Sequence, residues 1–339
     1  MRQRIDYIDA IRGFAIILVV MGHAIAWSYT DWHEVCLFSP IQPVNYMVGG
    51  VIWQVIYSFH MALFFMVSGF LSGDLMVSKN NIWGKVKNKT IRLMIPYLVT
   101  GYLIWFVRGN WGYWFLLTLY EMSLLWIVLS WLLNSLNQKR KIWVDVAFMV
   151  IVYLVLRAVN YVFPVTGVVI DSNLLKYYLP FCLGALMNRH TIIMNLVRNP
   201  RTFTFCIILF FLLFITRYFT AYQLFYRIVE KLNFVLSISA LLACVAVFHV
   251  FSAGVEKRVE RVLVYLGGVS LPIYVLHILF VIQMPAIGQL FLNQNAVTSI
   301  TLQIVFSLLF SIIAIVLSIV IYRVLRISAL IRLLLFGEK

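Results

Sequence analysis

With 339 residues, of which 63% are apolar and 12% charged, the chain has the composition of an integral membrane protein. A chain of this length holds roughly ten membrane-spanning helices and their loops, which leaves no room for a sizeable soluble domain. The net charge of +15 does not indicate a nucleic-acid-binding protein, because the basic residues fall in short loops rather than in one patch.

The apolar segments predict an all-α bundle of about ten transmembrane helices that forms a single domain over residues 1–339. Their expected ranges are 9–28, 51–72, 91–107, 113–136, 142–163, 177–188, 202–218, 232–251, 266–290 and 297–325. The helix at 177–188 is expected to be short, because Pro180 and Gly184 interrupt it. Residues 330–336 are expected to form an amphipathic tail at the inner interface of the membrane.

The positions of the lysines and arginines predict how these helices are oriented. Of the 27 basic residues, twenty fall in loops and helix ends on one side of the expected bundle and six on the other, with Arg12 inside the first helix. Because cytoplasmic loops carry an excess of lysine and arginine, both termini are expected to be cytoplasmic. The most basic loop, residues 79–92, is suited to anionic lipid head groups or to a phosphorylated ligand.

The first helix carries two polar side chains inside an otherwise apolar run. Arg12 and His23 are eleven residues apart, which on an α-helix is about three turns and about 16 Å, so both leave the same face. Asp9 lies one turn before Arg12 and is its expected partner. Because a charge inside lipid is costly, this stripe is a candidate functional site.

Three further polar side chains are expected at a similar depth, namely His60, Glu121 and His277. Histidine–carboxylate pairs abstract protons from hydroxyl groups, which makes general-base chemistry one interpretation. The alternative is structural: the histidines could join neighbouring helices, and Glu121 could neutralise an arginine. His190 is expected to be a solvated loop residue. The four cysteines lack the spacing of a zinc site or a disulfide framework, and no metal is expected.

Several motifs in chain order resemble those of the acyltransferase family 3 membrane proteins. Asp9-Ala10-Ile11-Arg12-Gly13-Phe14-Ala15 followed by His23 resembles the family's R-x10-H signature, and residues 58–70, SFHMALFFMVSGF, resemble its F-H-M-P-L-F-F-x-x-S-G-F run. Residues 92–97, 114–116 and 268–277 match further family segments. The main departure is Ala62 in place of the family's proline, which puts a local kink of the second helix in doubt.

This resemblance implies a multi-pass enzyme of the bacterial inner membrane that moves an acyl group, most often acetyl, from cytoplasmic acetyl-CoA to a hydroxyl of an extracytoplasmic glycan or lipid-linked sugar. On this interpretation His23 is the general base and Glu121 orients it, while Arg12 and Arg92 hold the phosphates of the acyl-CoA. Ser68, His60, Tyr274 and His277 are expected to line the donor site or to stabilise the oxyanion.

A second hypothesis from another class is a membrane carrier or exporter of a glycan or related small molecule, which would also place arginine, glutamate and histidine inside a bundle. The ordered motif set and the absence of an internal repeat favour the enzyme. Loss of acetylated product in His23→Ala would support the enzyme, whereas lost export with unchanged acetylation would support the carrier.

Overall fold

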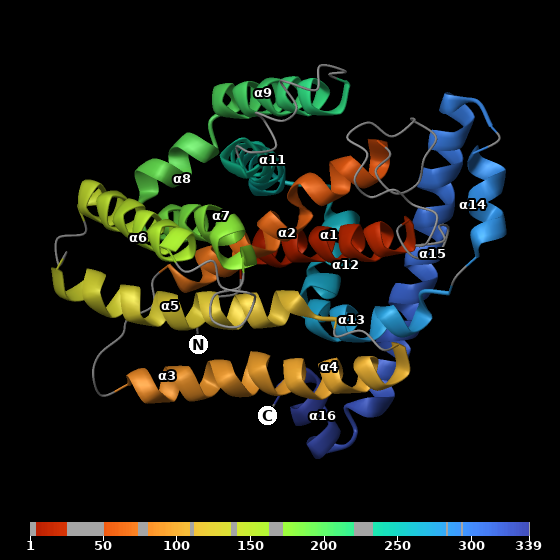
Figure 1. Cartoon of the computed structure of the whole chain (residues 1–339), viewed down its shortest axis with the longest axis horizontal. Coiled ribbons are helices and arrows are strands. Elements are labelled where there is room, and N and C mark those ends of the chain that lie inside the picture. The colour runs from red at the N-terminus through yellow and green to blue at the C-terminus, as the bar shows by residue number, and fades with distance from the viewer. Residues whose placement is uncertain are drawn as a thin grey trace. The chain divides into compact units, whose positions relative to one another are not determined.

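The computed structural model of the chain describes residues 5–25, 51–73, 81–108, 112–136, 141–162, 172–219, 233–282, 284–292 and 294–338. Every regular element within these ranges is a helix (Figure 1). The chain divides into two compact units, one made of Met1–Phe64 and Val197–Val324 and the other of Phe65–Leu196 and Leu325–Lys339. Helix α2 (Val51–Ser72) contributes its first part to one unit and its second part to the other.

The first unit is built around α1 (Asp6–His23), which packs mainly against α12 (Lys257–Gly268) and also against α11 and α13. Its other helices are α9 (Pro200–Phe219), α11 (Asn233–Ala253), α13 (Ser270–Leu276), the 3-10 turn η3 (His277–Phe280), α14 (Pro285–Leu292) and α15 (Ala296–Leu325). Gly13 and Gly267 allow the close contact of α1 with α12, because a Cβ at either would clash with a backbone carbonyl of the other helix. The backbone of α1 is thereby fixed against α12.

The second unit contains a continuous helical segment formed by α3 (Ile82–Lys89), the π-helical turn η2 (Thr90–Met94) and α4 (Ile95–Arg108) (Figure 1). The remaining helices are α5 (Trp114–Leu136), α6 (Ile142–Val162), α7 (Ser172–Arg189), most of α8 (Thr191–Val197) and α16 (Ala329–Phe336). The second part of α2 meets α7 through glycine: a Cβ at Gly69 would clash with the carbonyl of Phe181, and one at Gly184 with the carbonyl of Met66.

The C-terminal end of α2 is capped by side chains from distant helices. Asn188 Nδ2 donates to the Phe70 carbonyl at 2.5 Å, and Trp126 Nε1 donates to the Ser72 carbonyl at 2.8 Å. The Gly73 carbonyl accepts from Arg189 Nη1 at 3.3 Å. The last carbonyls of a helix have no partner within the helix, so these bonds satisfy groups that would otherwise be buried without one.

Most of the expected helices are confirmed within a few residues: α2, α5, α6, α9, α11 and α15 correspond to the ranges 51–72, 113–136, 142–163, 202–218, 232–251 and 297–325. Helix α1 begins at Asp6 instead of residue 9, and residues 26–28 of the expected range lie outside the described residues. The amphipathic tail is confirmed as α16. Helix α2 runs without interruption through Ala62, as expected for a helix that lacks the family's proline there.

Three expected ranges were wrong. The helix predicted at 91–107 begins at Ile82, because the polar residues of α3 continue the helix in the N-terminal direction. The helix predicted at 177–188 runs from Ser172 to Arg189 with Pro180 inside it, and Gly184 provides contact with α2 instead of a helix end. The single helix predicted at 266–290 is instead the end of α12, then α13, η3 and α14, with a bend of 64° between α12 and the α13–η3 segment.

Four of the described helices are long and apolar enough to cross a membrane, namely Ile52–Ser72, Trp114–Leu136, Ile142–Tyr161 and Val297–Leu325. Two bent pairs, Thr191–Val197 with Pro200–Ile215 and Lys257–Gly268 with Ser270–Phe280, raise this number to six if each pair is one span. The described chain therefore has four to six candidate spans by length and composition.

Candidate active site

Arg12 is held from two sides within the first unit. Its Nη1 lies 3.1 Å from Asp9 Oδ1, which confirms the expected ion pair, and its Nη2 donates to Ser270 Oγ at 3.0 Å. Both charged side chains are only partly exposed, at 22% for Arg12 and 13% for Asp9. Ser270 is the first residue of α13, so the bend after α12 brings its hydroxyl to the guanidinium of α1. A guanidinium fixed in this way keeps a defined orientation toward an anionic group.

His23 lies in the last turn of α1 and contacts His277, the first residue of η3. His23 Nδ1 is 2.7 Å from His277 Nε2, and the two rings are stacked with their centroids 5.0 Å apart. His277 is fully buried, and its Nδ1 lies 3.0 Å from the carbonyl oxygen of Ile273. The break between α12 and α13 thus supplies residues to both ends of the polar stripe on α1.

These contacts define the proton positions of the neutral pair. A carbonyl oxygen only accepts, so His277 Nδ1 carries the proton that it donates to Ile273. His277 Nε2 is then an acceptor, and His23 Nδ1 is the donor to it. In this tautomer the lone pair of the His23 ring is at Nε2. His277 therefore orients His23 in the way that a second residue orients a catalytic base.

The third histidine of this unit, His60, is buried on α2. Its Nδ1 lies 2.7 Å from the Ile56 carbonyl, and its ring meets the ring of Tyr57 edge-on with the centroids 4.9 Å apart. Both His60 and His277 act electrostatically on His23. The ring of Tyr274, also buried, has its centroid 6.0 Å from that of His277. The structure therefore groups His23, His60, Tyr274 and His277.

The other expected site residues belong to the second unit, and their roles remain predictions. Arg92 is exposed on η2, and Ser68 is half-buried on α2. Glu121 lies on α5, and its Oε2 is buried. Among the described residues, no group of three or more histidine, cysteine, aspartate or glutamate side chains could hold a metal ion. The three described cysteines, Cys182, Cys206 and Cys244, are free.

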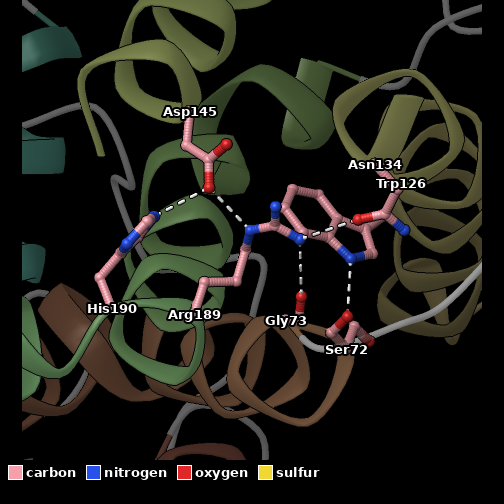
Figure 2. A network of polar contacts seen from close by, with 7 residues as sticks. All are labelled: Ser72, Gly73, Trp126, Asn134, Asp145, Arg189 and His190. Atoms are coloured by element: carbon pink, nitrogen blue, oxygen red, sulfur yellow. Dashed lines mark hydrogen bonds and ion pairs between the residues drawn. The ribbon is translucent and has the colours of Figure 1, made fainter. Parts of the chain in front are cut away.

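A buried ionic network in the second unit was not predicted from the sequence (Figure 2). Asp145 Oδ2 accepts from Arg189 Nε at 2.7 Å and lies 2.8 Å from His190 Nε2. Arg189 Nη1 also lies 3.4 Å from Asn134 Oδ1. The prediction that His190 is solvated was wrong: it is buried because its ring contacts the carboxylate. An acid at the start of one apolar helix and adjacent Arg-His residues at the end of another were the signal for this network.

Long apolar helices together with an arginine–histidine stripe on α1 define a helical membrane protein with a polar site between its helices. The chain belongs to acyltransferase family 3, whose acyltransferase domain it matches over residues 5–323. It is also similar to the nodulation protein NolL of Mesorhizobium japonicum, with 29% identity over 101 residues. That alignment covers 30% of this chain and 24% of the relative. No solved structure matches the chain.

Proposed function

We propose that this acyltransferase transfers an acyl group, most often acetyl, from cytoplasmic acyl-CoA to a hydroxyl of an extracytoplasmic glycan or lipid-linked sugar. The observation that carries the proposal is the contact chain from the Ile273 carbonyl through His277 to His23, with its resulting base at Nε2. A chain of this kind is the equipment needed to take a proton from a hydroxyl group. The acyltransferase family supplies the reaction class.

In the proposed step, His23 Nε2 removes the proton of the acceptor hydroxyl while its oxygen attacks the thioester carbonyl carbon. The carbon–sulfur bond of the tetrahedral intermediate then breaks, and the coenzyme A sulfur leaves with the proton that His23 had taken. His277 accepts a hydrogen bond from His23 Nδ1 throughout, and this bond strengthens when His23 becomes positively charged. The oxygen of the acceptor ends in an ester, and the enzyme returns to its starting protonation state.

The binding roles follow from charge and placement. Arg12, fixed by Asp9 and Ser270, is the proposed ligand of an anionic group of the donor, and Arg92 is the second. Glu121 and Ser68 are proposed to complete the site. We further propose ten spans with both termini cytoplasmic in the bacterial inner membrane, which would place the basic loop 79–92 on the side where acyl-CoA is found.

The test is acyl-CoA binding and turnover by the purified protein in nanodiscs. We expect Arg12→Ala to weaken donor binding, because it removes a charged hydrogen-bond donor that contributes about 1.5–3 kcal/mol, or about 10- to 150-fold in affinity. His23→Ala is expected to bind donor normally but to release no coenzyme A in the presence of acceptor. A wild-type protein that neither binds acyl-CoA nor forms product with any sugar acceptor would contradict the proposal.

A further inference from the structure

The surface of α3 and η2 is strongly basic and has no acidic residue of its own. Between Asp74 and Glu121 the sequence contains Lys79, Lys85, Lys87, Lys89, Arg92 and Arg108 and no aspartate or glutamate. Within residues 81–108, which the structure describes completely, neither Lys89 nor Arg92 forms an ion pair. Like charges that are held close together without a counter-charge favour the binding of an anion.

Lys89 and Arg92 are three residues apart, so their side chains leave neighbouring positions of the same helical segment. Lys89 is half-buried at the last residue of α3, whereas Lys87 is exposed. Partial burial lowers the pKa of Lys89 to about 8, and the charge of Arg92 contributes to the decrease. The two cations therefore act on each other, and an anion placed between them would relieve the repulsion.

The C-terminal helix α16 packs against this segment. It contacts α4 and η2, and Phe336 at its end is buried. Gly337 ends α16 with a φ of +61°, and a Cβ on it would clash with the backbone of Ile91 and Arg92. The end of the chain thus fits closely on the backbone of Arg92, and glycine is required both by the left-handed conformation and by the close approach.

The backbone below Arg92 is the π-helical turn η2, in which Thr90 and Tyr120 of α5 are hydrogen-bonded at 3.1 Å. π-helical turns occur frequently at functional sites because they change the direction in which a side chain points. Contacts with α5, α4 and α16 hold this turn from three elements. The segment is thus supported in the way that a binding site for a defined ligand requires.

We propose that Lys89 and Arg92 form a binding site for a phosphate group, with α16 and Gly337 as the support that fixes Arg92. The inference rests on the proposed function where it assigns the phosphate to the acyl-CoA donor. An anionic lipid head group carries the same chemistry, and the experiment below distinguishes the two sources. Lys89 is then a donor-binding residue in addition to Arg12 and Arg92.

Binding at this site is expected to depend on pH. A bound phosphate favours the charged ammonium, so binding is coupled to proton uptake by Lys89, and affinity falls as pH rises through about 8. The ligand does not titrate in this range, because the second pKa of a phosphate ester is about 6. Other ionisable groups on the segment and on its packed elements are Lys85, Lys87, Tyr97, Tyr120, Glu121, Arg332 and Glu338.

The experiment measures binding of coenzyme A and of adenosine 3′,5′-bisphosphate to the full-length protein in phosphatidylcholine nanodiscs. We expect Lys89→Met to weaken binding at pH 7 by about fivefold, a value between that of an exposed and a buried charged contact. Lys87→Met on the exposed side of the same helix is the matched control, expected within twofold of wild type. Lys89→Arg keeps its charge, so its affinity should not fall between pH 7 and pH 9.5.

A second arm measures retention of phosphatidylglycerol by native mass spectrometry. Loss of lipid retention in Lys89→Met with unchanged coenzyme A binding supports the phosphate site and assigns it to a lipid head group. A wild type that binds no coenzyme A but still loses lipid in Lys89→Met contradicts the proposed function and not the site. Binding of both ligands that is unchanged in Lys89→Met at either pH overturns the inference.

Discussion

Replacement of His277 tests the orientation of the base directly. His277 is fully buried, and its Nε2 is 2.7 Å from His23 Nδ1. A hydrogen bond between neutral groups contributes about 0.5–1.5 kcal/mol, and one to a charged group about 1.5–3 kcal/mol. Only the increase that accompanies protonation of His23 accelerates the reaction. That increase, about 1–1.5 kcal/mol, corresponds to about 5- to 10-fold in rate.

Loss of the defined tautomer adds to this factor, so we expect His277→Ala to lower kcat by about tenfold or more. The KM for acyl-CoA should change little, because His277 is not among the proposed ligands of the donor phosphates. In His277→Gln the amide oxygen can still accept from His23 Nδ1, and we expect an intermediate kcat. The partial rescue separates an orienting role from a packing role, which an amide and an imidazole would not fill equally.

The assay follows coenzyme A release by the protein in nanodiscs with a sugar acceptor, across a range of donor concentrations. Thermal unfolding of each variant is measured in parallel, because removal of a buried imidazole leaves a cavity that costs stability. A folded His277→Ala protein with kcat within twofold of wild type would refute the proposed orientation. Equal losses in His277→Ala and His277→Gln would show that packing, and not the hydrogen bond, is what matters.

Two further predictions concern stability, and denaturant or thermal unfolding in detergent measures both. Arg189→Met leaves the Asp145 carboxylate buried without its cation and should cost about 3–5 kcal/mol, whereas His190→Gln, which can still donate, should cost less than about 1 kcal/mol; equal effects would contradict the shared network. Gly13→Ala should destabilise the contact of α1 with α12 by about 1–3 kcal/mol, whereas Gly84→Ala, in open space on α3, should be neutral or stabilising.

The helical class and the ranges of several helices could be predicted from the sequence, because long apolar runs with polar ends leave few alternatives. The region after residue 257 could not, since the run 266–290 looks continuous in hydropathy while Gly267 and Gly268 end α12 and the chain turns before Ser270. Pro180 was misleading for the opposite reason: α7 continues through it. Glycine and proline indicate a break from sequence alone, and packing decides whether one occurs.

For the site, the pairing of Asp9 with Arg12 followed from helix geometry, because it is local. The contact of His23 with His277 depends on residues 254 positions apart, which the sequence placed at a similar depth without showing that they meet. His190 was misjudged because its partner, Asp145, lies 45 positions away and on another helix. Long-range polar pairs of this kind are set by how helices pack, and a single sequence does not record that packing.

The capping of α2 has a consequence for biogenesis. As the chain leaves the ribosome, the carbonyls at the end of α2 wait for Trp126, 54 residues later, and then for Asn188 and Arg189, 118 and 116 residues away. Arg12 waits far longer, for a serine 258 residues downstream. The early helices must therefore remain in the membrane with unsatisfied polar groups for most of synthesis. The polar stripe on α1, which begins translation of the first unit, is completed when almost all of the chain has been made.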